Sequence, residues 1–284
     1  MSDAHFSSFH RPEVHGHRGC RGERPENTLP AFQHALALGV DVLEMDVVVS
    51  ADNQVVVSHE PWLNPSFCLD PTGQPLPPDE VHRFNLYQMP YAEIRRCDCG
   101  LRRHPDFPDQ VSEPAHKPLL REVFVAIESQ TRALGRKPVG YSIELKSLPT
   151  GDFLFHPGPA DFLALVLAEL TLASVLDRTT LLCFDPRILR LAHRRHPELA
   201  TCLLVEANMP WIRSIEQLGF VPTTLGPAVR SVTSATVKQL RSAFPSLRLV
   251  PWTVNTIPDT RRLQRLEVDG ITTDYPKQLL TLLR

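Results

Sequence analysis

The chain has 284 residues, 42% of them hydrophobic and 22% charged, with a formal net charge of -2 at pH 7. This composition is that of an ordinary globular protein and excludes a disordered or fibrous chain. A charge so close to zero creates no long-range field for nucleic acid, so we expect no nucleic-acid partner. No stretch approaches the roughly 20 apolar residues of a membrane span. We therefore expect no stable membrane insertion.

The N-terminal sequence has neither a basic start with an apolar run nor a small-residue cleavage pattern. We predict a cytoplasmic location, or a periplasmic or secreted one if a signal segment has been removed. Six cysteines stand at positions 20, 68, 97, 99, 183 and 202, without a C-x-x-C pair or a second cluster suited to zinc. We expect them to be reduced, packed thiols. Nothing in the sequence indicates an oligomeric state.

The N-terminal part predicts a strand, a loop, a helix and two further strands. A short strand over residues 14–17 precedes a glycine-containing loop, and Asn27 fits the N-cap of a helix that Gly39 ends. Residues 41–49 alternate, so that Leu43 and its i+2 neighbours share one face while Glu44 and Asp46 share the other. After a turn, a strand over 54–58 ends at His59.

Residues 61–118 are rich in Pro, Asp, His and Arg and show little periodicity. We interpret this segment as a long irregular excursion from the scaffold and not as a second core.

From residue 119 onward, helical and strand patterns alternate regularly. The predicted helices cover 119–132, 160–173, 186–193, 210–218, 234–244, 258–266 and 276–283, and the predicted strands cover 139–146, 179–184, 200–205, a weak 229–232, 247–254 and 270–273. Repeated βα units imply parallel strands, and a total near eight strands closes into a barrel. The predicted fold is an α/β protein, a (β/α)8 TIM barrel with one irregular insertion, in a single domain over residues 1–284.

Carboxylates recur on the inward faces of two predicted strands. Glu44 and Asp46 are two residues apart, and Glu144 and Lys146 repeat that spacing later in the chain. Unpaired negative charge inside a barrel is costly, and oxygen-only ligands suit a hard cation such as Mg²⁺ or Ca²⁺. For either motif alone, a solvated strand face or a buried Glu–Lys pair explains the pattern as well as a metal site does.

Two histidines fall at predicted strand ends, where barrel enzymes assemble their active sites. His17 and His59 are suited to act as general base and general acid near neutral pH. Arg18 supplies a fork of donors suited to phosphate oxygens, or else a charge on a surface loop. We interpret Glu26, Asn27, Asp185 and Asp274 first as loop-shaping or helix-starting residues.

Several stretches together resemble the glycerophosphodiester phosphodiesterase family, whose hallmark runs H-R-G, P-E-N-T, G-x-D-x-x-E-x-D-V and V-x-x-H-D. The matching stretches are His17-Arg18-Gly19, Pro25-Glu26-Asn27-Thr28, Gly39-Val40-Asp41, Glu44-Met45-Asp46-Val47, Val57-Ser58-His59, Ile143-Glu144-Leu145-Lys146, Phe184-Asp185, Trp252-Thr253-Val254-Asn255 and Gly270-Ile271-Thr272-Thr273-Asp274-Tyr275-Pro276. The likeness covers nearly the whole chain.

The resemblance implies a TIM-barrel enzyme that hydrolyses glycerophosphodiesters to an alcohol and sn-glycerol 3-phosphate. It implies the following roles: one divalent cation, Mg²⁺ or Ca²⁺, on Glu44, Asp46 and Glu144; acid–base catalysis by His17 and His59; phosphate contacts from Arg18 and Lys146; and a pocket wall from Trp252. The implied partner is a small-molecule phosphodiester.

The chain departs from the family pattern at Glu60, which stands where an Asp usually follows the second histidine, and in its elaborate insertion over 61–118. The insertion leaves the substrate open. One alternative is a lysophospholipase D-like enzyme or a cyclising phospholipase D that acts on lipid headgroups. Another is a barrel without catalysis that only binds a phosphorylated ligand, against which the intact set of histidines and carboxylates argues.

Overall fold

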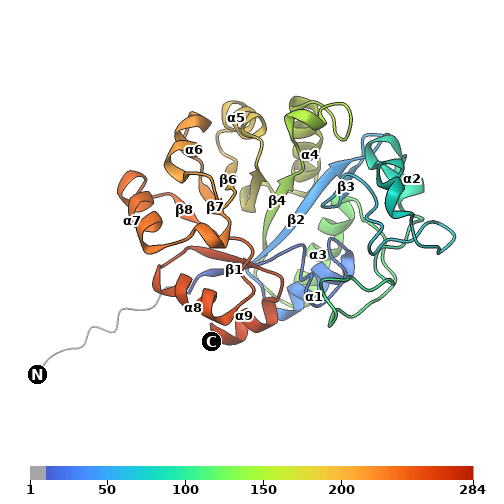
Figure 1. The fold of residues 1–284 in the computed structure, drawn as a ribbon, viewed down its shortest axis with the longest axis horizontal. Coiled ribbons are helices and arrows are strands. Elements are labelled where there is room, and N and C mark those ends of the chain that lie inside the picture. The colour runs from blue at the N-terminus through green and yellow to red at the C-terminus, as the bar shows by residue number, and fades with distance from the viewer. Residues whose placement is uncertain (1–10, 284) are drawn as a thin grey trace, which may run out of the picture.

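The computed structural model describes residues 11–283, which form a nearly closed barrel of eight parallel strands surrounded by helices (Figure 1). Neighbouring strands follow the order β8-β7-β6-β5-β4-β2-β1-β9 around the barrel. The strands are β1 (Glu13–Gly16), β2 (Val42–Val49), β4 (Gly140–Leu145), β5 (Thr179–Cys183), β6 (Ala200–Val205), β7 (Thr224–Pro227), β8 (Arg248–Leu249) and β9 (Gly270–Thr273). The predicted (β/α)8 TIM barrel is confirmed. The polar residues 1–10 lie outside the described part.

The barrel closes through backbone hydrogen bonds between the segments around β8 and β9. Asp269 donates to the Leu249 carbonyl at 2.9 Å, and Thr272 donates to the Pro251 carbonyl at 3.0 Å. Val254 in turn donates to the Thr272 carbonyl at 2.9 Å. The last strands thereby reach β1, which pairs in parallel with both β2 and β9. This closure brings the N-terminal motif and the C-terminal strands to one site.

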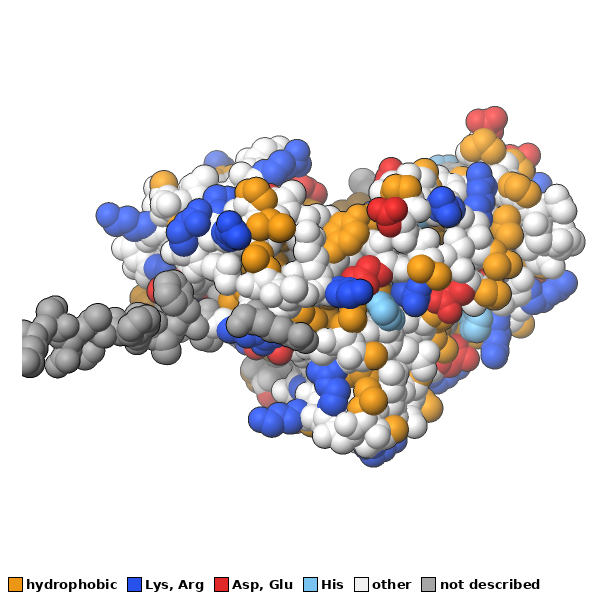
Figure 2. Space-filling view, turned by 90° about the horizontal axis from the view of Figure 1, so that it is seen from below, with side chains coloured by type: hydrophobic (Ala, Val, Ile, Leu, Met, Phe, Trp, Pro, Cys, Tyr) orange, Lys and Arg blue, Asp and Glu red, His pale blue; other side chains and the backbone are white. Residues whose placement is uncertain are grey.

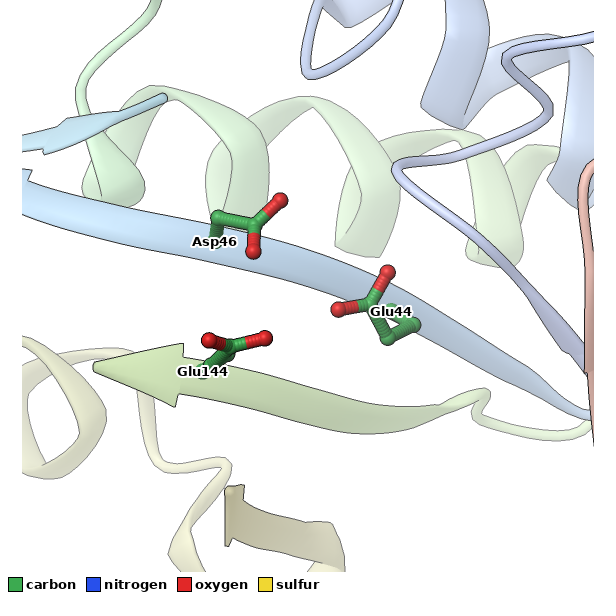
Figure 3. Close-up of side chains that lie close together, drawn as sticks. All are labelled: Glu44, Asp46 and Glu144. Carbon is green, nitrogen blue, oxygen red and sulfur yellow. The ribbon is translucent and has the colours of Figure 1, made fainter. Parts of the chain in front are cut away.

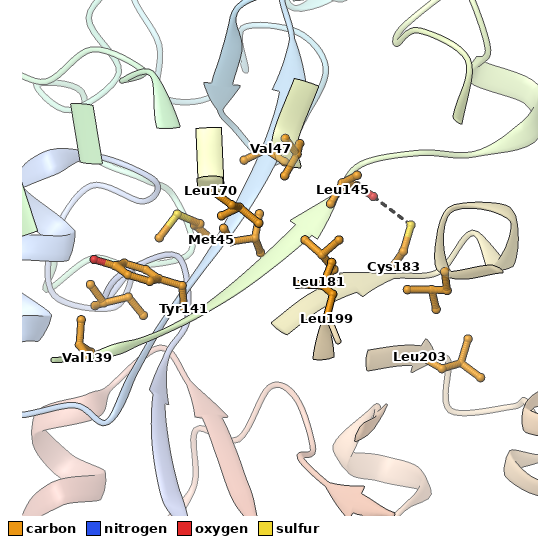
Figure 4. Packing of buried hydrophobic residues seen from close by; sticks show 14 of the residues in the cluster. Met45, Val47, Val139, Tyr141, Leu145, Leu170, Leu181, Cys183, Leu199 and Leu203 are labelled. Atoms are coloured by element: carbon orange, nitrogen blue, oxygen red, sulfur yellow. Dashed lines mark hydrogen bonds between the residues drawn. The ribbon is translucent and has the colours of Figure 1, made fainter. Parts of the chain in front are cut away.

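Helices pack around the outside of the barrel (Figure 1). They are α1 (Leu29–Leu38), α3 (Leu120–Ala133), α4 (Pro159–Ala173), α5 (Pro186–Arg195), α6 (Trp211–Leu218), α7 (Ser234–Ala243), α8 (Ile257–Arg265) and α9 (Pro276–Leu282). Figure 4 shows Met45 and Tyr141 among the buried apolar side chains of this layer, together with Leu170 of α4. The predicted alternation of β2 therefore sends Met45 toward the helices and the carboxylates into the barrel. Within residues 11–283, no helix is long and apolar enough to cross a membrane.

Two late strand predictions were wrong in position or length. The strand predicted over 229–232 lies earlier, at β7, and Val229–Ser231 forms a 3-10 turn. Neighbouring β6 supplies the pairing, with Cys202 opposite Thr224, although Gly226 and Pro227 lower the local strand propensity. The strand predicted over 247–254 contracts to Arg248–Leu249, since Pro251 has no N–H to continue the ladder.

Residues 61–118 leave the barrel after β3 (Val55–Val57), which pairs antiparallel with β2 outside the barrel path. The segment contains only short helices, namely the 3-10 turns η1 (Pro78–Phe84) and η2 (Leu86–Gln88) and the single turn α2 (Tyr91–Ile94). Its irregularity matches the prediction. However, it packs an apolar cluster of its own, which includes Leu63, Phe67, Leu86 and Ile94 and extends to Val48 and Val56 of the hairpin. The expectation that it forms no second core was wrong.

A disulfide joins Cys68 to Cys99 within the insertion. The prediction of reduced thiols was therefore wrong for these two cysteines, while Cys20, Cys97, Cys183 and Cys202 are free and buried. Cysteines 31 positions apart carry no local pattern that predicts pairing. The compact path of the inserted segment brings their Cα atoms to 4.0 Å.

The disulfide closes a loop in a segment with little regular structure, so we expect it to stabilise that segment. The double substitution Cys68→Ser/Cys99→Ser should lower its free energy of unfolding by about 3 kcal/mol. Thermal melts with and without reductant measure this. Reductant should destabilise the natural protein and leave the variant unchanged. Equal melting temperatures of the natural protein and the variant without reductant would contradict the expectation.

Candidate active site

Three buried carboxylates meet inside the barrel. Glu44 and Asp46 project from β2 and Glu144 projects from β4, where Asp46 and Glu144 are register partners (Figure 3). Each offers an oxygen, and these three oxygens lie within 4.8 Å of one another. Glu44 is 3% exposed, Asp46 1% and Glu144 9%. This oxygen-only donor set could hold a metal ion of the hard type.

The crowding of these acids changes their ionisation. Burial and the neighbouring charge of Asp46 raise the pKa of Glu44 well above its usual range. Burial also raises the pKa of Glu144, although Lys146 opposes that rise. Burial acts in the same direction on Asp46, but His59, Lys146 and Arg18 outweigh it and lower the pKa of that carboxyl. A bound cation would relieve the same repulsion, so the residues present fit a metal ion.

Arg18 and Lys146 lie against the carboxylate cluster. The Arg18 backbone N–H donates to Glu44 at 2.8 Å, and its side-chain Nε lies 3.3 Å from Asp46. The Lys146 Nζ donates to Glu144 at 2.7 Å and lies 3.6 Å from Asp46. Both predicted phosphate contacts are thus engaged with acids in this structure, and both line the cavity that Glu44 and Glu144 also line.

The loop after β1 is shaped by tight backbone geometry. Gly19 adopts a φ of +86°, and a Cβ there would lie 2.8 Å from Ala31, so only glycine fits this turn. The prediction that Asn27 is the N-cap of α1 was wrong, because Thr28 occupies that position. Instead, Asn27 donates from its amide to Asp46 at 2.9 Å. Its role is to hold a carboxylate of the cluster.

His17 is oriented by an acid from the far end of the chain. Its Nδ1 lies 2.5 Å from Asp274, and its Nε2 lies 3.9 Å from Glu44. Burial lowers the pKa of the imidazole, which favours the neutral ring at neutral pH. Burial opposes ionisation of Asp274 as well, but the His17 contact prevails and lowers the pKa of the carboxyl to about 2. The Nδ1–H therefore donates to an ionised carboxylate, and Nε2 faces the cluster.

His59 is held in a similar way by its sequence neighbour. Its Nδ1 lies 2.9 Å from Glu60, and its side chain remains 31% exposed. Because Nδ1 faces a carboxylate, Nε2 is the ring nitrogen left for a substrate. The two histidines thus share one arrangement, with an acid at Nδ1 and, within residues 11–283, no hydrogen-bond partner at Nε2.

A cavity of about 700 Å³ unites these groups, and its lining includes His17, His59 and Lys146. It continues along the barrel to Glu13 and Arg248 at the opposite end. Trp252 is among the residues that line the cavity; its Nε1 donates to the Gly226 carbonyl at 2.8 Å, and its ring meets Phe184 edge to face. In Figure 2, histidine and charged side chains gather beside a hollow in the molecular surface.

Several residues of the site have roles that the sequence did not predict. Asp274 holds His17 and is itself bound by the Asn255 amide at 2.6 Å, whereas we expected it to start a helix. Glu26 accepts from Arg18 at 2.8 Å, and Arg21 lies between Glu26 and Asp274 at 3.5 and 3.6 Å. For Glu26, Asn255 and Asp274 the only indication in the sequence was their place inside the matching family stretches, and Arg21 lies outside those stretches. Asp185, by contrast, caps α5 as expected.

The fold and the site define a TIM-barrel phosphodiesterase, and comparison with known proteins agrees. Residues 17–278 match the Glycerophosphoryl diester phosphodiesterase family. The chain belongs to that family. It is therefore an enzyme of the phosphoric diester hydrolase class, with glycerophosphodiester phosphodiesterase activity.

Individual relatives span almost the same length. A glycerophosphodiester phosphodiesterase of Caldanaerobacter subterraneus subsp. tengcongensis is 28% identical over 273 residues, covering 95% of this chain and 97% of the relative. A structure from Silicibacter pomeroyi, provisionally assigned as a glycerophosphoryl diester phosphodiesterase, has a TM-score of 0.84 and 32% identity over 96% of this chain and 93% of that one. An Oleispira antarctica phosphodiesterase, solved with its product sn-glycerol 3-phosphate, shares the fold with a TM-score of 0.74 and 22% identity over 95% and 96% of the two chains.

The Asp274 contact predicts a loss of activity when its charge is removed. Asp274→Asn should lower kcat by roughly 100-fold, because the imidazole loses the carboxylate that fixes its ring, and a positioned acid or base contributes on this scale. Steady-state kinetics measure the effect. The matched control is Asp161→Asn, on an exposed face of α4, which should keep the natural rate.

The same variant should show a pH-dependent loss of stability. The pKa of Asp274 falls from 3.8 to about 2 on folding. Its ionised form therefore stabilises the folded protein by about 2 kcal/mol at any pH above the unfolded pKa of 3.8. That contribution disappears as pH falls through about 2. In urea unfolding, the free energies of unfolding of Asp274→Asn and the natural protein should differ at pH 6 and differ less at pH 3. A constant difference across that range would contradict this origin.

Proposed function

We propose that this enzyme hydrolyses glycerophosphodiesters to an alcohol and sn-glycerol 3-phosphate by histidine acid–base catalysis at a divalent-metal site. The observation that carries the proposal is the paired orientation of His17 and His59. Each has Nδ1 against a carboxylate, and both line the cavity that contains Glu44 and Glu144. The product bound to the Oleispira antarctica relative supports sn-glycerol 3-phosphate as the phosphate-containing product.

Glu44, Asp46 and Glu144 would hold the cation, Mg²⁺ or Ca²⁺. When bound, such an ion supplies positive charge to the non-ester phosphate oxygens as phosphorus becomes five-coordinate. Arg18 and Lys146 would add hydrogen-bond donors to the phosphate oxygens. Asn27 and Arg18 already bind Asp46, so that carboxylate is held in place before any ligand arrives.

The chemistry divides between the two imidazoles. One Nε2 takes the proton of the attacking oxygen, which belongs either to water or to the neighbouring glycerol hydroxyl. The other Nε2 gives a proton to the departing oxygen as its bond to phosphorus breaks. Attack by water yields the monoester directly. Attack by the hydroxyl first yields a cyclic phosphate, which water then opens.

Substitutions separate the catalytic groups from the metal ligands. His17→Ala and His59→Ala should abolish measurable turnover while largely sparing metal affinity, because neither is in the carboxylate cluster. Glu44→Ala should weaken both. Calorimetric titration of Mg²⁺ and Ca²⁺ alongside initial rates tests this, and a near-normal rate in either histidine variant would overturn the acid–base assignment. A substrate with a p-nitrophenyl leaving group should restore rate selectively to the variant that lacks the acid.

The substrate assignment predicts a product pattern. With EDTA, release of alcohol from glycerophosphocholine should stop, and Mg²⁺ or Ca²⁺ should restore it. Product identification should give choline and sn-glycerol 3-phosphate. Preferential cleavage of lysophosphatidylcholine would instead favour the lipid-headgroup alternative, and a cyclic phosphate as the final product would favour a cyclising phospholipase D. Binding of phosphodiester without turnover in the presence of either ion would favour a non-catalytic barrel.

A further inference from the structure

The end of the inserted segment lies beside the strand that leads to His59. The Val57 N–H donates to the Pro118 carbonyl at 2.8 Å, and Val56 and Leu119 form an antiparallel bridge. Residue numbers run in opposite directions along these two segments. Lys117 is therefore placed across from Ser58, at the level of His59 and Glu60.

Lys117 is a buried lysine, with 3% of its surface exposed. Burial lowers the pKa of its ammonium group, and the charges of Glu60 and Glu26 oppose that change. No ion pair within 4.0 Å joins it to a carboxylate of residues 11–283, so the carboxylates that attract it lie beyond direct contact. An ammonium group is costly to bury unless negative charge faces it. Glu60 and Glu26 supply that charge.

Glu60 connects Lys117 to the active site. One carboxylate oxygen lies 2.9 Å from the His59 Nδ1, and the other is buried without a hydrogen-bond partner among the described residues. Burial disfavours ionisation of this carboxyl, yet the contact with His59 and the charge of Lys117 lower its pKa to about 2. Glu60 therefore stays an ionised acceptor for the imidazole.

The insertion holds Lys117 through its own packing. The Lys117 Nζ lies 6.0 Å from the ring of Phe67, which stacks on His104 at 4.9 Å. Cys68, next to Phe67, is bonded to Cys99, and the Cys99 N–H donates to the Ala115 carbonyl at 2.6 Å. These contacts fix both the ring and the chain that carries the lysine.

We propose that Lys117 is a positioning residue for the phosphodiesterase reaction, which holds His59 in its reactive orientation by holding the charge of Glu60. The inference rests on the proposed acid–base role of His59. It assigns a function to the insertion, whose last residues complete the site from outside the barrel. It also gives a reason for the buried acid at position 60, whose second oxygen has no hydrogen-bond partner among the described residues and is left to interact with the charge of a buried lysine.

Three variants test the assignment at saturating metal with glycerophosphocholine as substrate. Lys117→Met keeps the length of the side chain and removes its charge, and we expect kcat to fall about 10-fold with KM changed by less than twofold, as is usual when the partner of a reactive group is lost. Lys117→Arg should recover most of that loss. Lys137→Met, at an exposed lysine, is the matched control and should keep the natural rate.

A double-mutant cycle with Glu60→Gln tests whether Lys117 acts through Glu60. In the Glu60→Gln background, Lys117→Met should change kcat less than twofold, because the charge it holds is already gone. An equal loss in both backgrounds, an effect on KM alone, or no effect of Lys117→Met would overturn the proposal. If Lys117→Met does not fold, as judged by circular dichroism, Lys117→Gln takes its place in the same cycle with the same outcomes.

His59→Ala, assayed in parallel, separates this inference from the proposed function. If His59→Ala keeps its rate, the acid–base role fails, and the inference fails with it. If His59→Ala is inactive while Lys117→Met and the control are equally active, only the role of Lys117 fails.

Discussion

The structure depends on three acids being placed inside a barrel. Glu44, Asp46 and Glu144 leave less than a tenth of their surface exposed and are close enough to repel one another. Buried charge of one sign is costly, so the surroundings must supply the opposite sign. Arg18 and Lys146 supply part of it, and a bound cation would supply the rest. This requirement explains why Arg18 is buried and why Lys146 is directed at the carboxylates and is only partly exposed.

A second layer of acids lies behind the basic and imidazole groups. Glu26 binds Arg18, Asp274 binds His17 and Glu60 binds His59. Each acid binds one nitrogen of the Arg18, His17 or His59 side chain and leaves another nitrogen directed at the cavity. The same contact therefore orients the side chain and balances its charge. The insertion then faces this second layer, since His104 lies 3.8 Å from Glu26. The segment outside the barrel is electrostatically part of the site.

Sequence periodicity predicted most of the scaffold and failed where pairing partners decide the outcome. β6 and β9 were predicted with their observed bounds, because each is a short strand-forming run that ends directly before an acidic residue, Glu206 after β6 and Asp274 after β9. β7 was misplaced, because its Gly226 and Pro227 resemble a turn and only the register with β6 makes them a strand. Asn27 was assigned to a helix cap, the commonest local role of its side chain, whereas the fold presents Asp46 to it.

The sequence by itself determined which side chains share a face. The two-residue spacing of Glu44 and Asp46, and of Glu144 and Lys146, is a property of local backbone geometry, and the family motif identified their chemistry. Only the tertiary structure decided which groups meet. His17 and Asp274 are 257 positions apart and touch because the first strand, β1, pairs with the last strand, β9. Cys68 meets Cys99, and Lys117 lies beside the strand that leads to His59, because the insertion folds back on the hairpin, and no local pattern encodes that path.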